Sequence, residues 1–133
     1  MLDVSWTTIR LFLHVLAATV WVGGQLTLAG LVPTLRGLGP DVPRAAARRF
    51  NQIAWPAFGV LVATGIWNVI AVDVAGTSSA YQVTFMIKLL VVAAAGIGAF
   101  LHANATTKTG LAVWGAVSGV ASVAALFLGV LLD

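Results

Sequence analysis

The sequence predicts an all-α integral membrane protein, folded as an antiparallel four-helix bundle with both termini outside. Sixty per cent of its 133 residues are hydrophobic and 8% are charged, and the mean hydropathy is +1.02. Soluble domains carry about 25% charged residues, so the solvent of this chain must be largely lipid. Four apolar stretches are long enough to cross a bilayer: residues 9–32, 52–72, 83–103 and 111–132. We expect one domain over residues 1–133.

Local signals justify each helix in turn. The first stretch follows the acidic Asp3 instead of a basic cluster and is too long for a signal peptide, so it should remain in the mature chain. Before the second stretch, the segment 43–50 predicts a short helix lying at the inner membrane surface, because proline favours a helix start and arginines favour headgroups. The third and fourth stretches are joined by only seven residues, which favours antiparallel neighbours.

The basic residues predict the orientation in the bacterial cytoplasmic membrane. Segment 33–51 holds four arginines and segment 104–110 holds a lysine, whereas segment 73–82 holds neither residue type. Segments 33–51 and 104–110 should therefore be cytoplasmic. Arg10 is the exception, and we expect it to extend along the first helix to the outer headgroups. The positive excess thus indicates orientation and attraction to anionic lipid, with no nucleic acid as a partner.

Few ionisable residues lie within the predicted spans, and such residues are costly in lipid unless they serve a purpose. His14 and Lys88 lie at nearly the same depth, about 7–8 Å below the outer edge, if each helix residue rises about 1.5 Å. On the second helix, Asn68 and Thr64 bracket that level at about 6 and 12 Å. His102 lies far from them, near the cytoplasmic end. The sequence therefore predicts an outward-facing site around His14 and Lys88.

Structural roles would also account for these residues. His14 would satisfy its burial by bonding to Asn68 or to a water molecule. Lys88 is shallow enough to extend to the outer headgroups. His102 suits an interfacial position, or one near the negative end of a helix dipole. These readings predict a folded protein with no ligand at either histidine.

If the site binds a ligand, its residues favour a metal centre. Steps of four, seven and eleven residues place His14, Ala18, Trp21 and Gln25 on one helical face, which would give the pocket a tryptophan wall. A copper site built from protein alone would have His14 and Met86 as ligands, and the chain contains no cysteine. A haem needs only one axial histidine. The residues supply an all-protein copper site poorly, and a haem is simpler to explain, but the choice of cofactor between copper and haem b stays open.

The order of these residues resembles a known family. "HVLAATVWVGG" at 14–24, an arginine-bearing segment, "RRFNQIAWPAFGVLVATG" at 48–65 and "YQVTFMIKLL" at 81–90 are similar to the membrane domain of the copper-resistance protein D (CopD) family. The resemblance covers His14 to about Phe100. It implies a four-helix membrane unit that assists copper transport or homeostasis. The family positions that it carries over are His14, Trp21, Gly23, Gly24, Thr64, Gly65 and Lys88.

A more distant resemblance is to the HemJ family of haem-binding protoporphyrinogen oxidases. The shared features are a histidine on the first helix seven residues before a tryptophan, and a lysine before a leucine on a later helix. Only His14 and Lys88 are carried over. The resemblance implies a membrane redox protein that binds haem b or a porphyrin, with His14 as an axial ligand and Lys88 as a second ligand or a partner of a propionate.

Three functions therefore stay open. They are a CopD-like role in copper handling, a haem- or porphyrin-binding redox role, and a subunit of a larger membrane complex without a ligand of its own. Paired carboxylates, HExxH and phosphate-binding glycine loops are missing from the sequence, so a non-enzymatic role is favoured over a haem-dependent oxidoreductase. Expected partners are the lipid bilayer and either a second copy or a larger complex, with the GxxxG step at Gly115–Gly119 as the contact.

Overall fold

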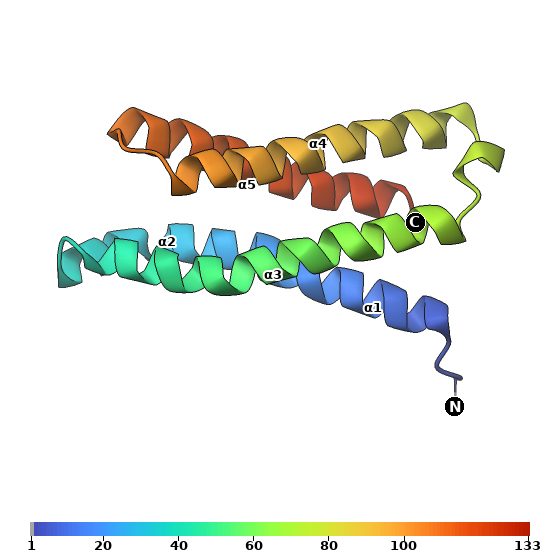
Figure 1. Ribbon diagram of the computed structural model, residues 1–133, viewed down its shortest axis with the longest axis horizontal. Coiled ribbons are helices and arrows are strands. Elements are labelled where there is room, and N and C mark those ends of the chain that lie inside the picture. The colour runs from blue at the N-terminus through green and yellow to red at the C-terminus, as the bar shows by residue number, and fades with distance from the viewer. Residues whose placement is uncertain (1) are drawn as a thin grey trace. The chain divides into compact units, whose positions relative to one another are not determined.

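The structure is a computed structural model that describes residues 2–133, and over these residues it contains helices and no strand. Four helical segments are long and apolar enough to cross a membrane. In chain order the elements are α1 (Trp6–Ala18), the π-helical turn η1 (Thr19–Gly23), α2 (Gly24–Leu38), α3 (Val42–Ala71), the short 3-10 helix η2 (Val74–Gly76), α4 (Ser79–Ala103) and α5 (Lys108–Leu131). Figure 1 labels the five α-helices. The all-helical class predicted from the sequence is confirmed.

The chain divides into two compact units. The first ends at Val72 and the second runs from Asp73 to Asp133. The first therefore contains α1, η1, α2 and α3, and the second contains η2, α4 and α5.

In the first unit, α3 lies along the continuous path of α1, η1 and α2 (Figure 1). The rings of Trp6 and Trp67 have centroids 6.4 Å apart, and His14 bonds to Thr64. Further along, Trp21 contacts Trp55. Residue numbers rise on one partner as they fall on the other, so α1 and α3 run in opposite directions.

A π-turn interrupts the first membrane-length helix at Thr19–Gly23. A π-turn holds about one residue more than an α-helical turn and therefore rotates the helix that follows it. The buried positions of α1 are Arg10 and Ala17, followed by Trp21 and Val22 in η1. The face expected from the sequence passed through Ala18 and Gln25. On that face Trp21 is buried, whereas Ala18 and Gln25 are only partly buried.

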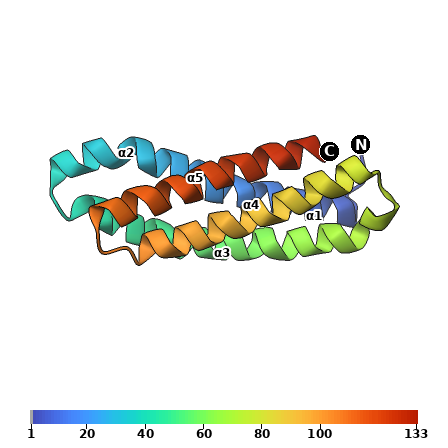
Figure 2. The ribbon, with the colours of Figure 1, turned by 90° about the horizontal axis from the view of Figure 1, so that it is seen from above.

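The connection between α2 and α3 is much shorter than expected. Leu38 ends α2 and Val42 begins α3, so three residues turn the chain (Figure 2). Gly39 makes this turn with a φ of +155°, a conformation that side chains disfavour. The segment 43–50 is helical, as predicted, but it continues into α3 instead of forming a separate helix. Pro43 lies within the first two helical positions, where proline costs no hydrogen bond.

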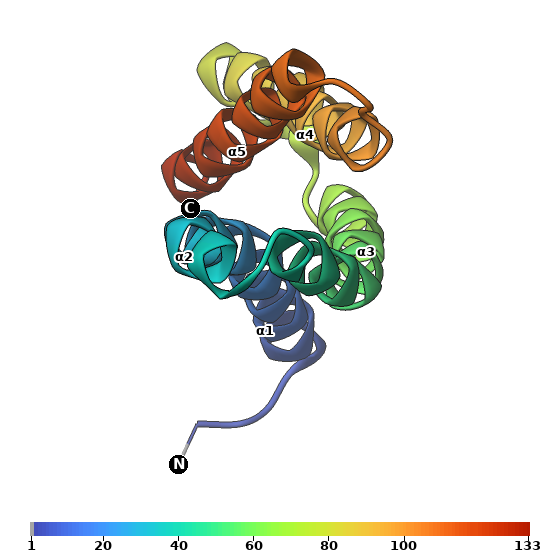
Figure 3. The same ribbon diagram turned by 90° about the vertical axis from the view of Figure 1, so that its left-hand side faces the viewer.

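In the second unit, α4 and α5 pack side by side (Figures 1 and 3). They approach closely at Gly98, where an added Cβ would lie 3.0 Å from the backbone nitrogen of Ser118. The buried hydroxyl of Ser118 donates to the carbonyl of Ala95 at 3.0 Å. Helix α4 begins at Ser79, four residues before the expected start, because the Ser78 side chain caps it by accepting from the Tyr81 amide.

Candidate functional site

His14 is held by a directed chain of hydrogen bonds between α1 and α3. Its Nδ1 lies 2.7 Å from the hydroxyl oxygen of Thr64. The Thr64 hydroxyl has a single proton, which it donates to the carbonyl of Val60 at 2.6 Å. Thr64 therefore accepts from His14, and Nδ1 carries a proton. A neutral His14 ring then carries its lone pair on Nε2, the nitrogen that would bind a metal.

Thr64 and its neighbour Gly65 bring α3 close to this ring. Thr64 is only 4% exposed, and a Cβ placed on Gly65 would lie 3.9 Å from Cε1 of His14. The Thr-Gly pair thus supplies a hydroxyl that fixes the ring and a small surface that it can lie against. The structure brings together His14 and Thr64, two of the residues that the sequence predicts for the site.

Trp21 lies deeper along the same helix pair, in an aromatic cluster. Its ring centroid is 4.5 Å from that of Phe58 and 5.6 Å from that of Trp55. With only 4% of its surface exposed, Trp21 is a core residue of the first unit. Gly24 follows one turn later, where a Cβ would overlap the Phe50 ring. A role of Trp21 as the wall of a ligand pocket stays a prediction.

Two polar residues lie one helical turn from His14 and Thr64, towards the ends of their helices. Arg10 precedes His14 by four residues and is 8% exposed, and its Nε is buried without a hydrogen-bond partner. Asn68 follows Thr64 by four residues, and its Oδ1 is also buried without a partner. The sequence pointed to Asn68 but not to Arg10. A charge near a helix end suggests a side chain that extends to the headgroups, whereas this one is buried.

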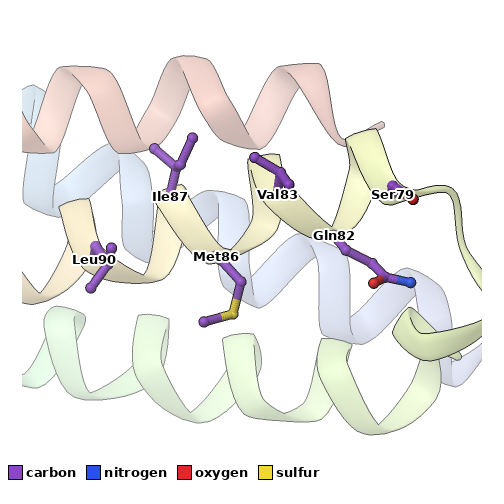
Figure 4. A pocket seen from close by; sticks show the side chains of 6 residues that line it. All are labelled: Ser79, Gln82, Val83, Met86, Ile87 and Leu90. Carbon is purple, nitrogen blue, oxygen red and sulfur yellow. The ribbon is translucent and has the colours of Figure 1, made fainter.

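Lys88 and Met86 belong to the second unit. The Nζ of Lys88 would lie 3.2 Å from a Cβ on Gly129, in the last turns of α5, where helix carbonyls leave a partial negative charge. Met86 lines a pocket along one face of α4 (Figure 4). The other lining residues are Ser79, Gln82, Val83, Ile87 and Leu90. The pairing of Lys88 with His14, and a copper site of His14 and Met86, stay predictions.

His102 has a structural partner. Its Nδ1 lies 2.8 Å from the carbonyl of Leu111; since a carbonyl only accepts, Nδ1 donates. The ring also packs on Gly115, whose added Cβ would lie 3.0 Å from it. His102 thus ties the end of α4 to the start of α5. The first glycine of the GxxxG step is used within the second unit, which weakens the case for that step as a contact with another chain.

The donor groups limit what metal chemistry the chain can support. Within residues 2–133, no group of three or more histidine, aspartate, glutamate or cysteine residues could hold a metal ion. Closed structural sites need about four such ligands. A haem differs because its ring supplies four nitrogens and the protein needs to add only one or two. His14, with its Nδ1 proton directed at Thr64, fits that requirement.

Comparison of the chain with protein-family models, curated proteins and solved structures finds no match.

Proposed function

We propose that the chain is a multi-pass protein of the bacterial cytoplasmic membrane and forms an antiparallel four-helix bundle. Four apolar helices of sufficient length support this proposal. Large apolar side chains are exposed along them, among them Ile70, Leu90, Val120 and Val130, as lipid-facing positions require. The arginines of segment 33–51 lie where α2 ends and α3 begins, so this end is cytoplasmic and both termini are outside.

Within that bundle, His14 binds a transition-metal centre through Nε2. The observation that carries this proposal is the hydrogen-bond chain from His14 through Thr64 to the carbonyl of Val60. A ligating histidine is commonly fixed through its other nitrogen, which sets the tautomer and the orientation of the ring.

Haem b, or a related porphyrin, is the metal centre that these residues suit best. His14 would hold it, and the bound haem would supply a redox-active iron. The protein's own contribution is orientation of the ring by Thr64 and exclusion of water by the aromatic cluster of Trp21, Trp55 and Phe58. Lys88 is the expected second ligand or the partner of a propionate.

Copper as cargo is the second candidate function. The observation that favours it is that three of the residues carried over from the CopD resemblance, His14, Thr64 and Gly65, meet at one interface. His14 bonds to Thr64, and Gly65 lies against the His14 ring. Gly24 packs on Phe50. Residues far apart in the sequence thus meet beside His14, which would be the copper ligand.

Absorption spectra of the detergent-purified protein, oxidised and dithionite-reduced, test both candidates when metals are quantified on the same samples. The variants are His14→Ala and, as the matched control, His102→Ala, which removes the other histidine. A Soret band that shifts on reduction, persists in His102→Ala and is lost in His14→Ala establishes the haem role.

Copper near one equivalent, lost only in His14→Ala, with no Soret band, establishes the copper role instead. A wild-type protein with neither ligand, whether purified or after incubation with haem b and with Cu(I), contradicts both. That outcome would leave a subunit of a larger membrane complex.

A further inference from the structure

Arg10 is a charged residue in the interior of the first unit, where charges are usually paired with a counter-ion. Its side chain is more than nine-tenths buried, and Nε has no hydrogen-bond partner. Moving a charged group out of water costs several kcal/mol unless a counter-ion or hydrogen bonds offset it. An anionic partner would therefore stabilise Arg10.

The chain's own carboxylates do not supply that group. The sequence contains four acidic side chains, Asp3, Asp41, Asp73 and Asp133, and each is exposed. Asp73 accepts from the backbone nitrogen of Gly76. None is buried as a partner for Arg10, so the anion must come from outside the chain.

Asn68 shares the layer of Arg10. Because α1 and α3 run in opposite directions and His14 bonds to Thr64, four residues back on α1 and four forward on α3 reach the same level. The amide oxygen of Asn68 is buried without a donor. The layer therefore presents a cationic donor on one helix and an acceptor on the other. A ligand that satisfies both carries an anionic oxygen and a hydroxyl group.

The position of the layer indicates where that ligand resides. Arg10 is five residues into α1 and Asn68 is three residues before the end of α3, so the layer lies about 5–6 Å inside the helix ends. The Trp6–Trp67 ring pair adjoins it, and tryptophan marks the boundary between headgroups and hydrocarbon. Lipid headgroups lie just outside this boundary, within reach of the long side chain of Arg10.

We propose that Arg10 and Asn68 bind the headgroup of an anionic phospholipid of the phosphatidylglycerol class. Its phosphodiester carries one negative charge, which matches the single charge of Arg10, and oxyanions pair well with the edge N–H groups of a guanidinium. Its glycerol hydroxyls donate to Asn68. This lipid site is independent of the ligand of His14.

The test is the melting temperature of the detergent-purified protein during titration with phosphatidylglycerol, phosphatidylcholine or inorganic phosphate. We expect phosphatidylglycerol to raise it by about 5 °C and the other two to leave it unchanged. In Arg10→Gln the rise should be lost. In Arg36→Gln, which removes an exposed arginine near the end of α2, it should persist.

Asn68→Asp decides the matter if Arg10→Gln fails to fold. It gives Arg10 an internal carboxylate of nearly the same shape, so the variant should melt higher in phosphatidylcholine and no longer respond to phosphatidylglycerol. An undiminished response in either variant overturns the proposal. An equal rise with inorganic phosphate assigns the site to a free anion. Loss of a His14-dependent spectrum in Arg10→Gln assigns Arg10 to the ligand of His14 and likewise overturns the lipid site.

Discussion

At the scale of single residues, His14 and Thr64 show what a sequence does and does not reveal about a site. Helix lengths and rise per residue were enough to put both residues at a similar depth. The direction of the hydrogen bond follows only from the third group, the Val60 carbonyl, which accepts the Thr64 proton at 2.6 Å. Arg10 was missed because its burial depends on packing, and packing is not encoded in the charge pattern of one helix.

Thr64→Val should weaken ligand binding at His14 by about 10- to 100-fold without preventing folding, because valine keeps the shape but removes the acceptor of the Nδ1 proton. Titration of the purified variant with haem b, or with Cu(I), measures the effect. Thr84→Val is the matched control, since the Thr84 hydroxyl makes the same type of bond, to Ala80 at 2.9 Å. Equal affinities in the two variants would show that Thr64 does not orient a ligating histidine.

Lys88→Met should lower the free energy of unfolding by about 0.5–1 kcal/mol, because the Lys88 ammonium lies beside the last turns of α5 and offsets their negative end. Lys108→Met should raise the free energy of unfolding instead, since Lys108 begins α5, at its positive end. Thermal unfolding in detergent compares the two. A Lys88→Met protein that keeps its stability but loses its ligand would return Lys88 to the binding site.

At the scale of elements, the sequence predicted the four apolar stretches well and their limits less well. Segment 43–50 was expected to form a short helix of its own at the inner membrane surface, separate from the spanning helix that follows it. Arginine is a good helix former, and proline is tolerated at a helix start, so α3 extends back to Val42. The π-turn at Thr19–Gly23 could not be predicted, because an added residue per turn leaves no mark in composition.

Gly98→Ala should destabilise the α4–α5 pair by about 1–3 kcal/mol, since its methyl group would meet the backbone of Ser118, which cannot rotate away. Gly119→Ala is the control on the facing helix. Nothing lies within 4 Å of its added Cβ, so the helix preference for alanine should leave stability unchanged or raise it by up to about 1 kcal/mol. Melting temperatures that fall equally would contradict the close approach at Gly98.

At the scale of the whole molecule, composition alone predicted an all-helical membrane protein, because the solvent around a protein determines how many polar residues its surface needs. A chain with 8% charged residues has too few polar groups to cover four apolar helices in water. The ligand could not be predicted in the same way, since copper and haem both require a histidine and the difference lies in how many other donors join it. That number depends on contacts between residues far apart in the sequence.

Sidedness is directly testable because the chain has no cysteine. In Asp41→Cys the single thiol should react with a membrane-impermeant maleimide only after the cells are opened, because the proposed topology puts the arginine-rich end in the cytoplasm. In Thr77→Cys the thiol should react with the same maleimide in intact spheroplasts, because the proposed topology puts this residue outside. The reversed pattern would invert the proposed topology, and labelling of both from outside would rule out membrane crossing by α3.

The three-residue turn between α2 and α3 also makes this end of the protein a suitable attachment point for a rigid fusion partner. The two helical segments joined there have 33 and 30 residues, or about 45–50 Å each, whereas the hydrocarbon core is about 30 Å thick. In the proposed topology this excess length would carry the arginines of α3 past the lipid as a stiff pair of helices, a stalk. A helical fusion partner joined in register at this stalk would project rigidly from the membrane and would give image alignment a fixed reference feature.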